Sequence, residues 1–259
     1  MITLFCAILC SLLVLASSSP IEGVTARPDD FRYLTAYSEP DSIGENYTFY
    51  EYTPELSVVM MNNVIDSVCA TGFWILYDSI NYIDRFVSCI YHGVSACATF
   101  APACQNRASS LRYAGSPYGL NNDYYNLYQE IYLGGEEFRG EKDAADLGDF
   151  DLTISSLVVT GQSAWTFYRG LNYTGLPMCM YPDGHYTNDG IDIDYGFIFD
   201  MSEFGWPDNS IRSVRRGCHV QNVVRAPVNR TPGGGKTSMT SAPEEMDAMS
   251  ITSVHTVHV

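Results

Sequence analysis

Short stretches in which apolar and polar residues alternate run through the middle of the chain, separated by glycines and small polar residues. Residues 46–52, NYTFYEY, are one example. Alternation with a period of two is typical of strands that bury one face. The 19 tyrosines, 21 glycines and 12 prolines agree, because tyrosine favours strands while glycine and proline favour turns. The pattern predicts an all-β protein.

The pattern repeats at a domain-sized interval. Residues 74–82, WILYDSINY, align without gaps with residues 165–173, WTFYRGLNY, which begin 91 positions later. A weaker copy precedes each of them, with Tyr37 and Tyr128 each 40 positions ahead of the tyrosine of the stronger copy. These spacings predict four units arranged as two pairs.

Each unit has the same internal order. A strand that ends in tyrosine leads to a short loop, a glycine and a second strand, which is the pattern of a β-hairpin. The glycine would adopt a backbone conformation closed to other residues, so that the hairpin folds over and the tyrosine ring packs on it. An apolar strand that begins with serine closes each unit. These serines are Ser67, Ser110, Ser156 and Ser213.

This order resembles the signature of the βγ-crystallin superfamily: tyrosine, an acidic or polar residue, three residues, an aromatic residue, one residue and glycine, with a serine further on. The fourth unit, with Tyr168, Tyr173 and Gly175, matches best. The resemblance covers about residues 32–218 and implies an all-β fold of two βγ-crystallin-like Greek-key β-sandwich domains, each of two motifs. The other units depart from the signature. Ser42 and Leu133 stand at the aromatic position of the first and third units, and Asp84 stands where the second unit should have its glycine.

The resemblance also implies where the domains lie. We expect domain 1 at residues 30–116 and domain 2 at residues 122–220, joined by a turn-rich linker at residues 117–121. Residues 1–18 carry an uncharged apolar run followed by small residues, as secretory signal peptides do, and the run is shorter than the ~20 residues of a membrane span. Residues 221–259, rich in Ser, Thr, Pro and Gly, predict a disordered tail. We therefore expect a secreted, extracellular protein with no membrane span.

The charge and the glycosylation motifs limit the classes of partner that we expect. The 30 acidic and 14 basic side chains give a formal net charge of −16, which disfavours binding to nucleic acid. Three Asn-x-Thr motifs, at Asn46, Asn172 and Asn229, predict a glycoprotein. We expect extracellular proteins or glycans as partners, and the oligomeric state stays open.

The cysteines predict disulfides. An even number of them in an oxidising compartment is typical of paired cysteines. The expected domain limits place four in domain 1 and two in domain 2, so Cys179 pairs with Cys218. Three pairings are open for the other four, of which we favour Cys97 with Cys104 and the remaining two together. The six cysteines outside the predicted signal peptide are Cys69, Cys89, Cys97, Cys104, Cys179 and Cys218.

The resemblance further implies candidate calcium sites. Many members of the superfamily bind calcium through the pattern Asn/Asp, Asn/Asp, two residues, Ser/Thr, Ser, and each site takes oxygens from both motifs of a domain. Such oxygens suit calcium, which prefers six to eight of them. The corresponding segments are residues 62–67, 105–110, 151–156 and 208–213, and none fits the pattern fully. The candidate ligands are Asn62, Asn63, Asp66, Asn106, Ser109, Asp151 and Ser155.

The departures from the pattern rank these segments. Asp66 replaces Ser or Thr but still offers an oxygen, whereas Gln105 is neutral and longer. Leu152 offers no oxygen. Arg212 places a cation where a ligand should be, which by similarity with lens crystallins suggests a lost site. We therefore rank the first segment best and the fourth worst. The alternative is that these side chains only hydrogen-bond their own loops.

No catalytic constellation is evident, so we expect no enzyme. A glycosidase needs two carboxylates at a fixed separation, and nothing selects a pair among Glu136, Glu137, Asp192 and Asp194. The Gly-x-Ser-x-Gly and His-Glu-x-x-His motifs do not occur in the sequence. We expect a secreted, non-enzymatic structural or interaction module with calcium as its candidate ion.

The alternative function is an extracellular carbohydrate- or protein-binding effector of the toxin-subunit or protease-inhibitor type, on the same fold. Tyrosines that are exposed would serve such contacts, but strand packing is the interpretation that we favour for them. The tyrosines in question are Tyr124, Tyr125, Tyr186 and Tyr195.

Overall fold

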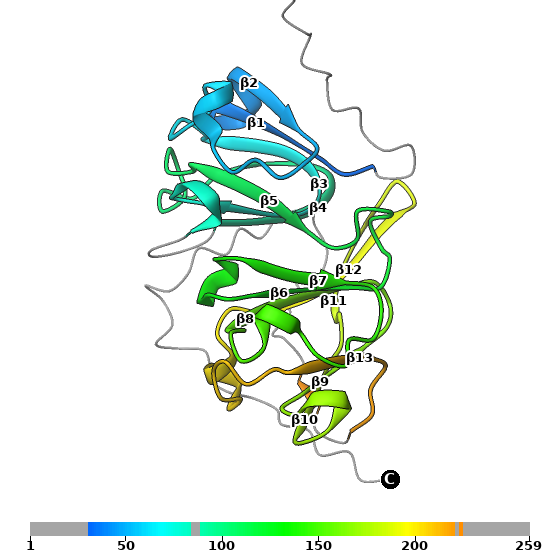
Figure 1. Ribbon diagram of the computed structural model, residues 1–259. Helices are drawn as coiled ribbons and strands as arrows, with labels where there is room; N and C mark the ends of the chain where they lie inside the picture. The colour runs from blue at the N-terminus through cyan, green and yellow to red at the C-terminus, as the bar shows by residue number, and fades with distance from the viewer. Residues whose placement is uncertain (1–30, 84–88, 221–222, 225–259) are drawn as a thin grey trace, which may run out of the picture.

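The computed structural model describes residues 31–83, 89–220 and 223–224 (Figure 1). Over these residues the chain forms 14 β-strands and seven short 3₁₀ helices, and no α-helix. No helix among them is long and apolar enough to cross a membrane. The strands form two groups that lie one above the other in Figure 1, an N-terminal half with β1 to β5 and a C-terminal half with β6 to β14. The predicted all-β fold class is confirmed.

Strands β3 and β4 of the N-terminal half are long enough to take part in both of its motifs. Residues 67–71 of β3 pair with β1, whereas residues 73–77 of the same strand pair with β5. Strand β4 pairs with β3, with a register shift between Ala70 and Gly72, where the φ of the glycine is 117°. This exchange of strands between layers is the mark of paired Greek keys. The strands are β1 (Tyr33–Glu39), β2 (Ile43–Phe49), β3 (Ser67–Tyr77), β4 (Cys89–Thr99) and β5 (Ser110–Ala114).

The C-terminal half has two sheets, in the orders β11-β12-β8-β6-β7 and β13-β9-β10-β14. Strand β12 lies in the fourth unit but pairs with β8 of the third, so these two motifs exchange a strand as well. The strands are β6 (Tyr124–Tyr128), β7 (Glu137–Gly140), β8 (Ser156–Thr160), β9 (Trp165–Tyr168), β10 (Pro177–Met180), β11 (Gly184–Asn188), β12 (Ile191–Ile198), β13 (Ser213–Arg216) and β14 (Val223–Val224).

Strand β14 differs from the prediction for the end of the chain. Its two residues belong to the segment 221–259, for which we predicted disorder, yet they pair in parallel with β10. The rest of that segment lies outside the described residues, as do the predicted signal peptide at residues 1–18, Asp84 and Asn229. The domain limits at residues 30–116 and 122–220 stay predictions.

Each of the four hairpins turns through a 3₁₀ helix that contains left-handed residues. In the fourth unit these are Asn172 and Tyr173, with φ values of 53° and 62°, and Gly175 follows with a φ of 78°. The Tyr168 ring packs on the Tyr173 ring with centroids 6.0 Å apart, as the pattern of this unit predicted. The hairpin helices are η1 (Pro40–Ser42), η3 (Ile80–Tyr82), η4 (Ile131–Leu133) and η6 (Leu171–Tyr173), and the others are η2 (Leu56–Val59), η5 (Gly148–Phe150) and η7 (Met201–Phe204).

The closing serine of each unit holds its hairpin in place. The serine hydroxyl accepts a hydrogen bond from the backbone N–H of the last residue of the 3₁₀ helix, at 3.0 Å in all four units. It donates to the carbonyl of the residue before that helix, at 2.5 to 2.7 Å. All four serines are fully buried, so both bonds are shielded from water. One residue type at one place therefore fixes four turns.

Each half has its own apolar core around a tryptophan. Trp74 and Trp165, which open the two repeated segments, are both fully buried. The Trp74 Nε1–H donates to the Thr71 carbonyl at 3.0 Å. Burial of side chains this large supplies much of the driving force for each sandwich.

A third apolar cluster joins the two halves. It combines Phe73 and Ile75 of the N-terminal half with Leu133 and Val158 of the C-terminal half, among others. The β11–β12 hairpin also reaches the N-terminal half, where the Asn188 side-chain amide donates to the Val94 carbonyl at 3.1 Å.

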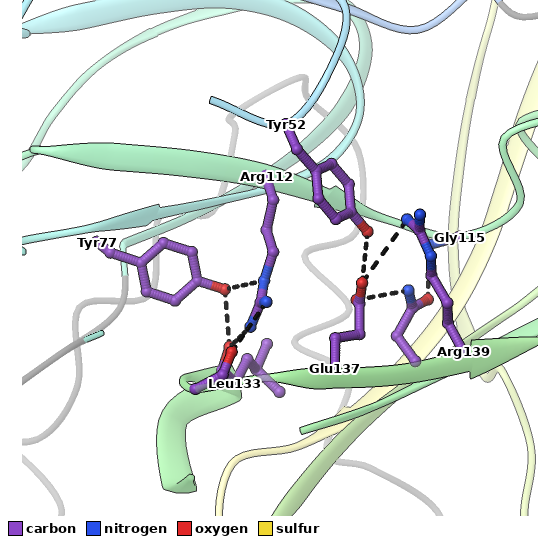
Figure 2. A network of polar contacts seen from close by, with 9 residues as sticks. Tyr52, Tyr77, Arg112, Gly115, Leu133, Glu137 and Arg139 are labelled. Atoms are coloured by element: carbon purple, nitrogen blue, oxygen red, sulfur yellow. Dashed lines mark hydrogen bonds and ion pairs between the residues drawn. The ribbon is translucent and has the colours of Figure 1, made fainter. Parts of the chain in front are cut away.

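Arg112 crosses this junction as a buried cation (Figure 2). From β5 its Nε–H donates to the Tyr77 hydroxyl at 2.8 Å. Its two terminal nitrogens reach across to the C-terminal half and donate to the carbonyls of Leu133 at 2.8 Å and Gly135 at 3.0 Å. A buried guanidinium is tolerated only when it is hydrogen-bonded in this way, so the network fixes one half against the other.

The three disulfides correct one prediction. Cys179 is bonded to Cys218 as predicted, but the favoured pairing of Cys97 with Cys104 is wrong. The register of β3 and β4 places Cys97 directly opposite Cys69, with Cα atoms 3.9 Å apart, and these two are bonded. Cys104, in the loop after β4, is bonded to Cys89 at the start of the same strand.

Candidate functional site

The four candidate calcium segments take equivalent places in the fold, because each ends on the closing serine with which a strand begins. The second residue of every segment has a left-handed backbone, with φ values of 54° at Asn63, 55° at Asn106, 59° at Leu152 and 54° at Asn209. Asparagine tolerates this conformation, whereas leucine rarely adopts it. The four loops thus share one geometry even where their sequences differ.

The two loops of the N-terminal half face each other. The Asn63 N–H donates to the Ala108 carbonyl at 2.8 Å, and the Asn106 N–H donates to the Ile65 carbonyl at 2.9 Å. In the C-terminal half the Asn209 N–H likewise donates to the Ile154 carbonyl at 3.1 Å. These bonds join the second residue of one loop to the fourth residue of the other, so each potential site draws on two motifs.

Asp66 has the feature that best fits a cation. Its Oδ1 atom is buried and has no hydrogen-bond partner among the described residues. Its backbone is held at both ends, since its N–H donates to the Tyr37 carbonyl at 2.9 Å and its carbonyl accepts from the Phe100 N–H at 2.8 Å. A buried carboxylate oxygen without a donor is costly, and a bound cation would remove that cost.

The same two loops form a second potential site around Asn63 and Ser109, and these two side chains already contact each other. The Ser109 hydroxyl donates to the Asn63 Oδ1 at 3.3 Å. Asn62 precedes them and is half-buried. At this second position the alternative interpretation, in which the side chains hydrogen-bond their own loops, describes the contact directly.

In the C-terminal half, the side chain of Arg212 takes the position that Ser109 has in the N-terminal half. Arg212 Nε lies 2.8 Å from Asp151 Oδ1, and its Nη2 lies 2.6 Å from Asp151 Oδ2, a two-point pairing. The hydrogen bonds from Arg212 hold the pKa of the Asp151 carboxyl below its ordinary value. Asp151 is thereby neutralised without a metal ion, and the residues here do not fit calcium.

The second potential site of the C-terminal half lies around Ser155 and Asn209. The Ser155 hydroxyl lies 2.8 Å from the Gln129 carbonyl and 3.3 Å from the Asn209 Oδ1. Across the described part of the chain, no group of three or more His, Cys, Asp or Glu side chains could hold a metal ion. A calcium site would therefore depend on amide, hydroxyl and carbonyl oxygens as well as on Asp66.

The carboxylates considered for a glycosidase have other neighbours. Glu137 accepts hydrogen bonds from the Tyr52 hydroxyl at 2.8 Å and from the Asn126 amide at 2.8 Å. Asp194 accepts from the Asn121 amide at 2.8 Å and lies 2.6 Å from His185 Nδ1. Glu136 and Asp192 are exposed.

Three of the four tyrosines considered for partner contacts are buried. Tyr124, Tyr125 and Tyr195 are between 2% and 8% exposed, and Tyr186 packs at the edge of the cluster between the halves. Strand packing, the favoured interpretation, is confirmed for the three buried rings. The glycosylation candidates Asn46 and Asn172 are exposed and stay predictions.

Sequence reasoning missed a groove at the junction of the halves. Its lining comes from residues 51–52, 113–124 and 139, and it includes Glu51, Tyr118 and Arg139. No spacing within the sequence could have grouped them, because only the packing of the two halves brings them together.

Comparison with known proteins confirms the fold. No protein-family model matches the chain, and no curated protein sequence matches it. Among solved structures it is similar to geodin, a βγ-crystallin from Geodia cydonium, with 17% sequence identity, 71% of this chain and 98% of geodin covered, and a TM-score of 0.52. The chain therefore has the βγ-crystallin fold.

Two other solved structures match with lower TM-scores. A βγ-crystallin from an archaeon is 28% identical over 37% of this chain and 99% of its own, with a TM-score of 0.29. Protein S complexed with calcium is 17% identical over 71% of this chain and 98% of its own, with a TM-score of 0.27. Neither carries an inference about function.

Proposed function

We propose that this chain is an extracellular, non-enzymatic βγ-crystallin-like module that binds calcium in its N-terminal half. The observation that carries the proposal is the buried Oδ1 of Asp66, which has no donor among the described residues. The three disulfides suit an oxidising compartment outside the cell.

The ion would sit between the two facing loops of the N-terminal half. Asp66 would supply a carboxylate oxygen, and the neighbouring loop would supply the side chains of Asn106 and Gln105. Carbonyl oxygens and water complete the six to eight ligands that calcium requires. The ion would thus tie one motif to the other rather than take part in chemistry.

Binding to the folded chain alone would stabilise it by mass action. At a free calcium concentration 100 times the Kd the gain is about 2.7 kcal/mol, or about 5–10 °C in Tm for a chain of this size. The role is then that of a stabilised scaffold whose rigidity depends on the calcium around it.

Calorimetric titration of calcium into the chelator-treated protein, with thermal melting in parallel, tests the proposal. We expect calcium to release or absorb heat and to raise the Tm, and Asp66→Ala to abolish both effects. Asp151→Ala is the matched control, because it removes a carboxylate at the place that Arg212 already neutralises. Its starting Tm can fall, but the gain from calcium should persist. A wild-type protein with neither heat nor a Tm shift would contradict the proposal, as would an Asp66→Ala variant that still responds.

A further inference from the structure

A groove of about 420 Å³ opens where the two halves meet, and none of the candidate calcium ligands lines it. Its walls include four tyrosines, Glu51 and Arg139. The volume falls within the range of small-molecule sites, and junctions between domains are where such sites concentrate. The tyrosines are Tyr52, Tyr113, Tyr118 and Tyr124.

Tyr52, which lines the groove, is hydrogen-bonded to the C-terminal half (Figure 2). The Tyr52 hydroxyl donates to Glu137 Oε2 at 2.8 Å, and the Asn126 amide donates to Glu137 Oε1 at 2.8 Å. The Asn126 Oδ1 in turn accepts from the Gly115 N–H at 2.8 Å. Both carboxylate oxygens of Glu137 are therefore engaged, and the Tyr52 ring is held across the junction of the two halves.

Arg139 brings hydrogen-bond donors to the groove. Its guanidinium carbon lies 4.7 Å from the centroid of the Tyr52 ring, and its side chain is 41% exposed. The nearest Glu137 oxygen is 3.7 Å from Nη1, beyond hydrogen-bond distance. Within the described chain, the Arg139 side chain contacts Tyr52 and Glu137 but makes no direct hydrogen bond. Its N–H groups remain able to bind a ligand.

The rim adds an aromatic face. Tyr118 is 65% exposed, whereas Tyr113 and Tyr124 are 2% and 6% exposed and form the wall behind it. A tyrosine ring presents an apolar face for packing and a hydroxyl at its edge. The groove therefore offers a flat surface beside groups that donate and accept hydrogen bonds.

The charges of the groove select the class of ligand. Glu51 repels an anion, Arg139 repels a cation, and the formal net charge of −16 further disfavours polyanions. A neutral ring with C–H groups on its face and hydroxyl groups around its edge can pack on a tyrosine ring and hydrogen-bond both charged side chains. We propose that this groove binds a neutral saccharide, with a pyranose ring packed on Tyr118 and its hydroxyls bonded to Arg139 and Glu51.

Saturation-transfer NMR on the full chain tests this proposal. The probes are the methyl glycosides of glucose, galactose, mannose and N-acetylglucosamine, with glucuronate and choline as charged comparisons. We expect transfer to at least one neutral glycoside, with binding at least about tenfold weaker in Tyr118→Ala and in Arg139→Ala. Tyr47→Ala, at an exposed tyrosine of β2, is the matched control and should bind as the wild type does.

The outcomes are decisive in both directions. Saturation transfer to a neutral glycoside that weakens in both groove variants and persists with chelator supports a saccharide site separate from the proposed calcium loops. Transfer to no neutral glycoside, binding of glucuronate or choline alone, or an unchanged affinity in either groove variant overturns the proposal. Because Tyr118 is exposed, its replacement leaves the core intact, and a thermal melt of each variant verifies folding.

Discussion

The two halves of the molecule build the same pair of facing loops, but the aspartate in each pair of loops has a different environment. In the N-terminal half, Asp66 keeps a buried carboxylate oxygen that has no donor among the described residues. In the C-terminal half, Asp151 receives two hydrogen bonds from Arg212, at 2.8 and 2.6 Å. One loop pair therefore keeps a carboxylate oxygen without a donor, which our proposal assigns to calcium, whereas its counterpart carries a cation within the chain.

This difference separates what the fold needs from what an ion adds. The hairpins, closing serines and left-handed loop positions occur in both halves, so the Greek keys do not depend on the ion. An Arg–Asp pair that is partly exposed to solvent, as this one is, contributes little to stability by itself. Its effect is to neutralise Asp151 without calcium, so we expect any calcium dependence of the protein to arise mainly in the N-terminal half.

Acid should give the largest contrast between the halves. His92, in β4 of the N-terminal half, is buried, and burial lowers its pKa to about 4 from 6.5. Between these values the unfolded chain binds more protons than the folded one, so stability falls as the pH drops from 6.5 to 4. The loss from this group approaches about 3 kcal/mol at the acid end and vanishes above pH 7. Urea denaturation across this pH range measures it.

Two substitutions sharpen the acid experiment. His92→Phe keeps a ring beside Phe73, whose centroid is 6.0 Å from that of His92, and should flatten the pH profile. His185→Gln, at a histidine of the C-terminal half whose side chain is 52% exposed, is the matched control. If the slope persists in His92→Phe, the acid sensitivity belongs to other groups.

The closing serines should show how closely the halves agree. Ser67→Ala and Ser156→Ala each remove a buried hydroxyl that accepts one hydrogen bond and donates another. Each leaves a backbone N–H and a carbonyl without their partner, so we expect a loss of about 1–3 kcal/mol of unfolding free energy in both. Equilibrium denaturation in chelator measures the pair without any contribution from calcium. A difference between the two larger than about 2 kcal/mol would show that the motifs are not energetically equivalent.

The fold was predictable because its determinants are local and repeated. The Tyr168, Tyr173 and Gly175 pattern specifies a hairpin by its own backbone geometry, and the closing serine lies at a recognisable place after it. The disulfide partners of the N-terminal half were not predictable. Cys69 meets Cys97 only because the later part of β4 pairs with the first part of β3, a register that depends on the exchange of strands between motifs.

The site was predictable in kind but not in detail. The sequence located the four loops and marked Arg212 as foreign to a calcium site, yet it could not show that Arg212 pairs with Asp151 from another motif. The orphaned oxygen of Asp66 is likewise a property of packing. The groove left no signal, since residues such as Glu51 and Arg139 meet only across the junction.

Converting the C-terminal loops into the N-terminal kind should give the smallest effect and the most direct test of the comparison. Arg212→Ser frees Asp151, and Leu152→Asn adds an oxygen at a position whose φ of 59° suits asparagine better than leucine. In an Asp66→Ala background, which lacks the proposed native site, the double substitution should restore a calcium-dependent rise in Tm. Leu152→Asn alone should not, because Arg212 would still hold the carboxylate. Thermal melting with calcium and with chelator measures both, and an equal response of the two variants would mean that the Arg212–Asp151 pair is not what excludes the ion.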